Sequence, residues 1–162
     1  MLGNSGEHEG VKFKAQGVTA EGLLRRTTRP VLVVPHDAMG ESKIVIAYDG
    51  SLAADRALRA AAELAEVTDM SEAHLITVTD NTEEAHLIQA PAVDYLHAYD
   101  LEVIPVVLTG KPAEVIAKYA KDIDATILAL GAFGSNRLKE SIFGSTTVAM
   151  LKNADCAVLL IA

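Results

Sequence analysis

The chain has 162 residues, of which 50% are hydrophobic and 4% aromatic, and its formal net charge is −8 at pH 7. This length suits one domain with an appendage, and the acidic balance argues against nonspecific binding to nucleic acid or to an anionic membrane, which attract clustered positive charge. No apolar run approaches the roughly 18 residues of a membrane span, and the N-terminus lacks a signal-peptide pattern, so we expect a cytoplasmic protein.

The first 42 residues are polar at first and then read VTAEGLLRRTTRPVLVVPHD, over residues 18–37. We expect a helix near residues 18–26 and a strand at PVLVV, residues 30–34, because that run is rich in β-branched residues. The regular alternation of strand and helix begins only after this segment, at residue 43.

From residue 43 onward, apolar runs of strand length alternate with stretches whose apolar residues recur at helical spacing. Strands are expected at KIVIAYDGS (43–51), AHLITVTD (73–80), LEVIPVVLTG (101–110), DATILALG (124–131) and CAVLLIA (156–162). Helices are expected at 51–67, at 111–122 and near 145–153, and AVDYLHAYD (92–100) is interpreted as a helix end. The segment with Glu83 and Glu84 has the weakest pattern, and we expect a polar link or mobile flap there.

The alternation predicts an α/β fold with an open, parallel five-stranded sheet flanked by helices. Pro105 lies inside the third strand and predicts an edge position or a bulge, because proline has no N–H for a neighbouring strand. Ligands of such sheets bind beyond the carboxyl ends of the strands. Four segments end at that edge, which are Asp49, 78–80, 109–110 and 131–134.

The N-terminal segment resembles the chain's own C-terminus. Gly17 aligns with Gly144 at an offset of 127 residues, and at the same offset VLVV (31–34) aligns with VLLI (158–161). LGNSG at residues 2–6 also resembles LGAFG at 130–134, with a slip of one residue. An internal repeat changes the expected domain organisation. We therefore interpret residues 1–38 as a partial repeat, the helix and last strand of a second copy, and residues 43–162 as a complete domain.

A glycine-rich stretch, GAFGSNRLKESIFGST at residues 131–146, separates the fourth strand from the helix that follows. Glycines permit close backbone approach, and a helix N-terminus offers unpaired N–H groups to an anion, so the stretch is a candidate phosphate site. It matches neither GxxxxGK[ST] nor GxGxxG. The alternative is a flexible connection ending in a Ser/Thr helix cap. Cys156 starts an apolar strand, and we expect it to pack in the core.

The spacing of this stretch, Gly-2x-Gly-9x-Gly-Ser-Thr, resembles the motif of ATP-binding universal stress proteins. KIVIAYDGS also resembles the first strand of that family with its aspartate, and LITVTD its second strand. The resemblance covers residues 43–162 and implies an adenine nucleotide α-hydrolase-like, Rossmann-like fold. RRTTRPVLVVP at residues 25–35 resembles the end of such a domain, as in tandem members of the family, which carry two copies.

The resemblance implies a site for ATP. Asp49 would bind ribose hydroxyls or the adenine edge, Ala47 would pack beside it, and Val78 would meet adenine through its backbone. The phosphates would be held by Gly131, Gly134, Gly144, Ser145 and Thr146, with further contacts from Arg137, Lys139 and Thr147. Mg²⁺ or Mn²⁺ would bridge the phosphate oxygens without protein side chains. From the residues alone, Asp49 has a second role open, as the cap of the next helix.

The resemblance implies a regulatory, stress-response role with slow ATP hydrolysis at most, because no catalytic base is recognisable in the sequence. A nucleotide-free dimerisation module is one alternative. An adenylating enzyme of the related α-hydrolase group is another, although its SGGxDS loop is replaced by AYDGS. The resemblance also implies a homodimer through antiparallel pairing of fifth strands. Residues 30–34 are expected to pair with 157–161, within one chain or, as we favour, exchanged between two.

Overall fold

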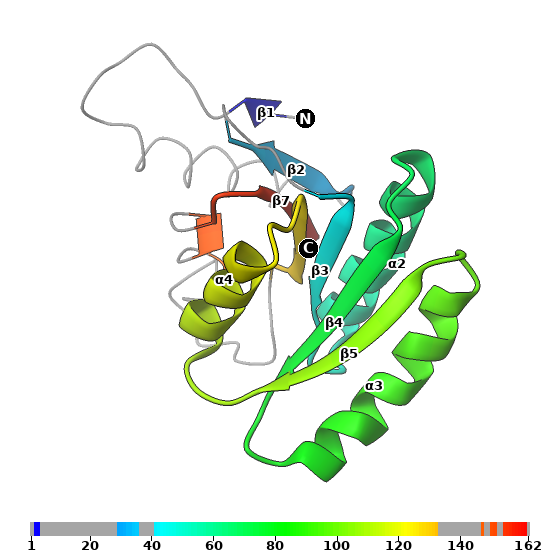
Figure 1. The fold of residues 1–162 in the computed structure, drawn as a ribbon, viewed down its shortest axis with the longest axis vertical. Coiled ribbons are helices and arrows are strands. Elements are labelled where there is room, and N and C mark those ends of the chain that lie inside the picture. Colours follow the sequence, from blue (N-terminus) through cyan, green and yellow to red (C-terminus); the bar gives the residue numbers. More distant parts are fainter. Residues whose placement is uncertain are drawn as a thin grey trace.

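A seven-stranded sheet in the order β1-β2-β7-β6-β3-β4-β5 forms the centre of the computed structural model (Figure 1). The structure describes residues 2–3, 29–35, 41–132, 147, 150–151 and 154–161. The strands are β1 (Leu2–Gly3), β2 (Val31–Val34), β3 (Lys43–Ala47), β4 (Glu72–Val78), β5 (Glu102–Leu108), β6 (Ile127–Gly131) and β7 (Ala157–Ile161). The helix expected near residues 18–26 lies outside the described residues.

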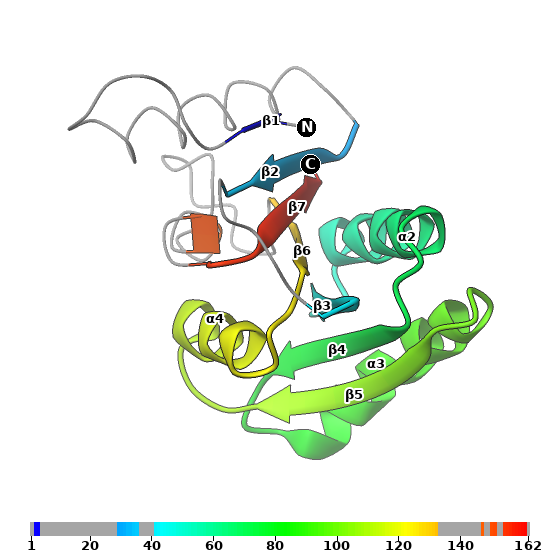
Figure 2. The same ribbon diagram turned by 45° about the horizontal axis from the view of Figure 1, so that its top comes forward.

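The five strands β7, β6, β3, β4 and β5 are parallel, which confirms the predicted α/β fold. Two N-terminal strands extend this five-stranded sheet, of which β2 was expected and β1 was not. β2 pairs antiparallel with β7, and β1 pairs parallel with β2. The expected pairing of residues 30–34 with 157–161 is therefore confirmed, and in this structure it forms within one chain (Figure 2).

Helices cover both faces of the sheet. α2 (Leu52–Val67) and α3 (Thr82–His97) lie on one face, and α4 (Pro112–Asp122) lies on the other (Figure 2). One hydrophobic cluster joins α2 and α3 to the sheet, and a second joins α4 to the opposite face. The described residues of the expected helix near 145–153 are helical, namely Thr147, Met150 and Leu151.

The prediction of a link or flap around Glu83 and Glu84 is wrong, because both residues lie in the first turn of α3. Asn81 caps this helix. Its side chain accepts a hydrogen bond from the Glu84 N–H at 3.1 Å and donates one to the Glu84 carboxylate at 3.3 Å. Acidic side chains in a first turn also interact favourably with the helix dipole. The segment is therefore a stable helix start.

Pro105 lies on β5, the edge strand of the sheet, as its missing N–H predicts. Next to it, the buried side chain of Gln89 from α3 donates to the Leu75 carbonyl at 3.0 Å and to the Val106 carbonyl at 2.9 Å. These carbonyls belong to β4 and β5. Gln89 therefore ties the edge strand and its neighbour to the helix that covers them.

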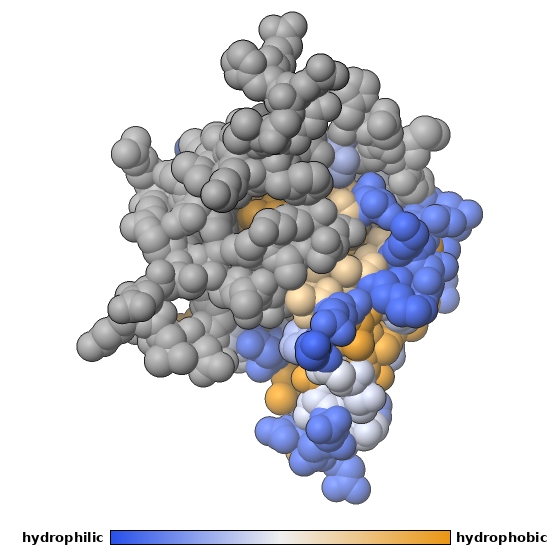
Figure 3. Space-filling view, turned by 90° about the vertical axis from the view of Figure 1, so that its left-hand side faces the viewer, coloured by the Kyte–Doolittle hydropathy of each residue, from blue (hydrophilic) through white to orange (hydrophobic). Residues whose placement is uncertain are grey.

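The surface seen in Figure 3 shows hydrophilic side chains around a smaller group of hydrophobic ones, where its residues are described. Within the described residues, no helix is long and apolar enough to cross a membrane. Cys156, immediately before β7, is buried as expected, and its burial raises the pKa of the thiol to about 11. The thiol is therefore protonated at neutral pH and packs as a small apolar side chain.

Candidate functional site

The carboxyl ends of the parallel strands meet at one edge of the sheet. In the register of the sheet, Ala47 at the end of β3 pairs with Ile76 of β4, and Val78 pairs with Leu108 at the end of β5. Gly131 ends the neighbouring strand β6. Three of the predicted site residues, Ala47, Val78 and Gly131, are thus brought to the same edge by the sheet, as the sequence predicts.

The turn that follows β3 carries Asp49. Gly50 in this turn has a φ of +73°, a left-handed conformation that glycine adopts without strain. A Cβ at Gly50 would also lie 3.1 Å from the Ile88 side chain of α3. Both the turn and the close approach to α3 therefore favour glycine at this position.

Asp49 itself is exposed, and its Oδ1 accepts a hydrogen bond from the Ser51 N–H at 3.0 Å. The cap of α2 is Ser51, whose side chain accepts from the Ala54 N–H at 3.2 Å. The alternative role of Asp49 as the helix cap is therefore wrong. Asp49 instead supports the turn before the cap, and its carboxylate is open to solvent at the edge where the strands end.

Tyr48 connects this turn to the rest of the edge. Its N–H donates to the Ile76 carbonyl at 2.8 Å, and its carbonyl accepts from the buried Thr77 hydroxyl at 2.8 Å. The Tyr48 hydroxyl donates to Asp55 Oδ1 of α2 at 2.6 Å. Burial, and then the bond to Asp55, raise the pKa of Tyr48 to about 12. The residue before Asp49 is thus held by both β4 and α2.

Gly131 lies against the start of α2. A Cβ at this position would lie 2.7 Å from two atoms of Ala53, its carbonyl carbon and its Cβ. It would lie 2.8 Å from the Ala53 carbonyl oxygen. No real Cβ packs this closely against backbone. This contact explains in structural terms why glycine ends β6, and it brings the N-terminus of α2 next to the point where the glycine-rich stretch begins.

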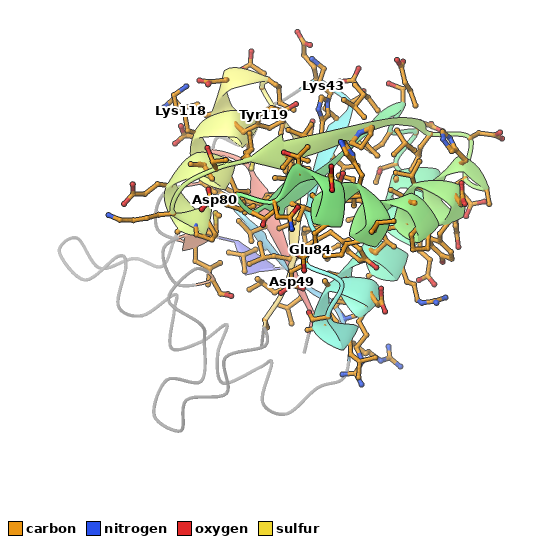
Figure 4. The ribbon with its side chains drawn as sticks, turned by 90° about the horizontal axis from the view of Figure 1, so that it is seen from below. Lys43, Asp49, Asp80, Glu84, Lys118 and Tyr119 are labelled. Atoms are coloured by element: carbon orange, nitrogen blue, oxygen red, sulfur yellow. The ribbon has the colours of Figure 1, made fainter. Side chains whose placement is uncertain are left out.

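The loop after β4 lies at the same edge. Val78 is half-buried, and the Thr79 N–H that follows donates to the Leu108 carbonyl at 2.9 Å. Asp80 is exposed next to the cap of α3. Figure 4 shows Asp49 and Glu84 on one side of the ribbon and Lys43 and Tyr119 on the opposite side. The exposed acidic groups Asp49, Asp80 and Glu84 therefore come from loops and helix starts at the carboxyl edge.

Several predicted phosphate contacts lie outside the described residues, namely Gly134, Arg137, Lys139, Gly144, Ser145 and Thr146. Thr147 is described; it is helical and only 3% exposed. Its contact with a phosphate stays a prediction. In the described ranges, no group of three or more His, Cys, Asp or Glu side chains could hold a metal ion.

The sequence reading missed Tyr48, Thr77 and Asp55. Tyr48 precedes Asp49, and both other residues bond to it: Asp55 accepts from its hydroxyl, and Thr77 donates to its carbonyl. One signal was available: Asp55 follows Tyr48 by seven residues, which spans the turn and the first turn of the predicted helix. This spacing places a phenol hydroxyl and a carboxylate one helical turn into α2 within reach of each other.

A sequence model of the universal stress protein family matches residues 41–162 of the chain. A universal stress protein of Synechocystis sp. is 29% identical over 163 residues, a match that covers 98% of this chain and 56% of that protein. The chain thus spans about half the length of this relative. The match also includes nearly all of the N-terminal segment, which the family model does not reach.

Solved structures share the fold. A universal stress protein from Archaeoglobus fulgidus DSM 4304 matches with a TM-score of 0.70 and 25% identity, covering 99% of this chain and 59% of that one. Another universal stress protein from Archaeoglobus fulgidus, solved in complex with dAMP, matches with a TM-score of 0.61 and 24% identity over 76% of this chain and 100% of that one. With the family model matching well over half of its residues, the chain belongs to the universal stress protein family.

Proposed function

We propose that the chain binds an adenine nucleotide, with ATP as the expected ligand, at the carboxyl edge of the sheet. The observation that carries this proposal is the convergence of Ala47, Asp49, Val78 and Gly131 from three parallel strands on one edge. Open α/β sheets bind their ligands at this edge. The complex of an Archaeoglobus fulgidus relative with dAMP gives independent support for a nucleotide of this class.

Within this proposal, the described residues bind the nucleoside end. The exposed Asp49 carboxylate accepts hydrogen bonds from the ribose or the adenine edge, the half-buried Ala47 packs beside it, and the backbone of Val78 meets the base. Gly131 starts the segment that holds the phosphates. The remaining phosphate contacts are the residues predicted from the glycine-rich stretch, Gly134, Arg137, Lys139, Gly144, Ser145, Thr146 and Thr147.

We expect the bound nucleotide to regulate the protein, with slow hydrolysis at most. A phosphate cradle supplies mainly ground-state binding unless a positioned base activates water. Mg²⁺ or Mn²⁺ is proposed to bridge the phosphates, with its other positions filled by water, because Mg²⁺ keeps several waters in such sites. Nucleotide binding without turnover suits a protein whose conformation or contacts change with the nucleotide supply.

The most direct test is to denature the purified protein and identify any nucleotide that it releases. Calorimetry with ATP and Mg²⁺ then measures the affinity, which we expect to be micromolar, or about −8 kcal/mol. Gly144→Val should abolish ATP binding, since a branched side chain would intrude on the phosphate path. Equal ATP affinity in the variant would contradict the phosphate cradle, and no binding by the wild type would favour a nucleotide-free interaction module.

We also propose that residues 1–38 are the end of a second universal stress repeat. The pairing of β2 with β7 supports this, because its register is symmetric in the repeat. The paired residues are Val31 with Leu160, Leu32 with Leu159, and Val33 with Val158. At the offset of 127 residues, the central pair joins two equivalent residues, Leu32 and Leu159. The two outer pairs are equivalent to each other, because 31 corresponds to 158 and 33 to 160, so a two-fold rotation exchanges them. Such a self-complementary register is the mark of an isologous contact between two copies.

The register of β1 gives a second line of support. Leu2 and Gly3 pair in parallel with Val33 and Val34 of β2. Leu130 and Gly131 of β6 pair in the same way with Leu160 and Ile161 of β7. The LG dipeptide thus takes the same place beside its neighbouring strand in both halves, as the resemblance of LGNSG to LGAFG predicts.

The homodimer expected from the sequence stays a prediction, and it requires β2 to be exchanged between two chains. In the structure, β2 covers the edge of β7 within its own chain. Light scattering of the full chain distinguishes an exchanged dimer from a monomer by its mass. Deletion of residues 1–38 should change the number of chains per particle, obtained as particle mass divided by chain mass. It should also change the melting temperature, because it leaves the apolar edge of β7 unpaired. Unchanged values would show that the segment is a passive tail.

A further inference from the structure

We propose that Tyr48 is a positioning residue for nucleotide binding, which acts by holding Asp49 through a hydrogen bond to Asp55. This inference rests on the proposed function, since it concerns how that site is built. All the residues concerned lie between the end of β3 and the first turn of α2. Tyr48 does not have to touch the nucleotide itself, because its hydroxyl is occupied by Asp55 at 2.6 Å.

The geometry forms a closed ring around Asp49. The Tyr48 side chain reaches Asp55, the Asp55 N–H donates to the Ser51 carbonyl at 2.9 Å, and the Ser51 N–H donates to Asp49 Oδ1 at 3.0 Å. The backbone of Tyr48 closes the ring, because it leads directly into Asp49. Every residue of this ring except Gly50 is therefore held by a bond to another member or to β4.

The Tyr48–Asp55 bond is the link in this ring that joins strand to helix through side chains alone. Ser51 caps α2 locally and would keep the helix start intact without Tyr48. The backbone of Tyr48 is tied to Ile76 and Thr77 and would keep the end of β3 in place. Core packing already holds α2 on the sheet, and the side-chain bond adds a direct link between α2 and the residue that precedes Asp49.

The chemistry of the pair suits a permanent link. Tyr48 is 6% exposed, and the half-buried Asp55 accepts the hydrogen bond of its hydroxyl. The acceptor is a carboxylate, and hydrogen bonds to charged groups are stronger than neutral ones. Since its pKa is raised to about 12, the tyrosine keeps its proton and remains a donor at neutral pH. An exposed carboxylate placed by such a link loses less freedom when a ligand binds, which raises affinity.

The test is calorimetric titration of the full chain with AMP, which requires no metal ion. Tyr48→Phe keeps the ring and removes the hydroxyl. We expect AMP affinity to fall roughly threefold to tenfold, the range for one lost hydrogen bond. Asp55→Ala should give the same loss, whereas Asp55→Asn keeps an acceptor oxygen and should restore most of the affinity. If the pair served stability alone, variants with equal melting temperatures would bind AMP with equal affinity.

A double variant identifies the route of the effect. If Tyr48 acts through Asp49, Tyr48→Phe should cause no further loss of AMP affinity when Asp49 is already alanine. The matched control is Tyr119→Phe, which removes a tyrosine hydroxyl bonded to His74 at the other end of the sheet. It should lower the melting temperature and leave AMP affinity unchanged.

The outcomes separate the two proposals. Wild-type protein that does not bind AMP or ATP contradicts the proposed function. Wild-type binding that Tyr48→Phe leaves unaltered overturns the positioning role alone. An equal loss with Tyr48→Phe in the presence and in the absence of Asp49 also overturns it, because the effect then reaches the nucleotide by another route. Rescue by Asp55→Asn together with a non-additive double variant supports it.

Discussion

Two tyrosines near opposite ends of β4 use the same chemistry for different purposes. At the carboxyl end, Tyr48 donates to Asp55 and holds a turn with an exposed carboxylate. Toward the amino end, the Tyr119 hydroxyl is 2.8 Å from His74 Nδ1, and His74 Nε2 is 2.5 Å from Glu72 Oε1. The His74 and Tyr119 rings also meet edge to face.

The difference lies in what each network joins. The chain from Glu72 through His74 to Tyr119 links β4 to α4, two regular elements that already pack against each other. The Tyr48–Asp55 pair links a strand to a helix across a turn of three residues. Both networks join elements that pack in a common core, and only the one at Tyr48 adjoins an exposed carboxylate, whose position we propose that it holds.

The largest effect on stability is expected for Gly131→Ala at the carboxyl edge. The added Cβ would lie 2.7 Å from the backbone of Ala53, so α2 or β6 must move. We expect a loss of about 1–3 kcal/mol in the free energy of unfolding, measured by denaturant melts. Ala53→Gly should rescue this variant only in part, because the carbonyl group of residue 53 remains. An unchanged stability of Gly131→Ala would show that the close packing is not a constraint.

Asp49→Ala should separate binding from stability. We expect ATP affinity to fall by roughly 1.5–3 kcal/mol, as for the loss of hydrogen bonds to a charged group, with a small change in the melting temperature. Ser51→Ala is the matched control. It removes the cap of α2 and should lower stability by about 1 kcal/mol while its effect on ATP affinity stays smaller. If Asp49→Ala instead lowered the stability and left the ATP affinity unchanged, the role of Asp49 would be structural.

Tyr119→Phe should have the reverse profile of Asp49→Ala. It removes the hydroxyl partner of the buried His74, and we expect the free energy of unfolding to fall by about 1 kcal/mol. Nucleotide affinity, measured by calorimetry, should not change, because this network lies away from the carboxyl edge. A reduced affinity would mean that the two ends of the sheet are coupled.

Alkaline pH should distinguish the tyrosines by a smaller effect. The pKa of Tyr48 is raised from 10 to about 12, and that of Tyr119 is raised as well, in both cases first by burial. The unfolded chain therefore loses these protons at lower pH than the folded one. Their contribution to stability is complete below pH 10 and declines as the pH rises through the folded pKa values.

The measurement is the dependence of the melting temperature on pH between 9 and 12. Tyr48→Phe should make the alkaline decline shallower than in the wild type, because one raised pKa is removed. Tyr119→Phe should do the same to a smaller extent. A steeper decline in either variant would contradict the sign of the shift.

Part of the fold could not be predicted, because its signal was not local. The buried residues of α3, which are Ala85, Gln89, Ala92 and Leu96, recur at helical spacing. The apolar pattern fails at Gln89, and Pro91 in the same helix is a residue that normally ends one. Gln89 is buried only because β4 and β5 provide two carbonyl acceptors. No property of residues 81–91 alone reveals these partners.

The sequence by itself determined the alternation of strands and helices, an edge or bulge position for Pro105, and the placement of Ala47, Val78 and Gly131 at the carboxyl edge. These follow from local hydrophobic periodicity and from the rule that parallel strands end on one side. Only the tertiary structure decided that the Tyr48 hydroxyl meets Asp55, that Gly131 lies against Ala53, and that Gln89 reaches carbonyls of β4 and β5. Each of these depends on a contact between residues whose spacing in the sequence does not specify their distance in space.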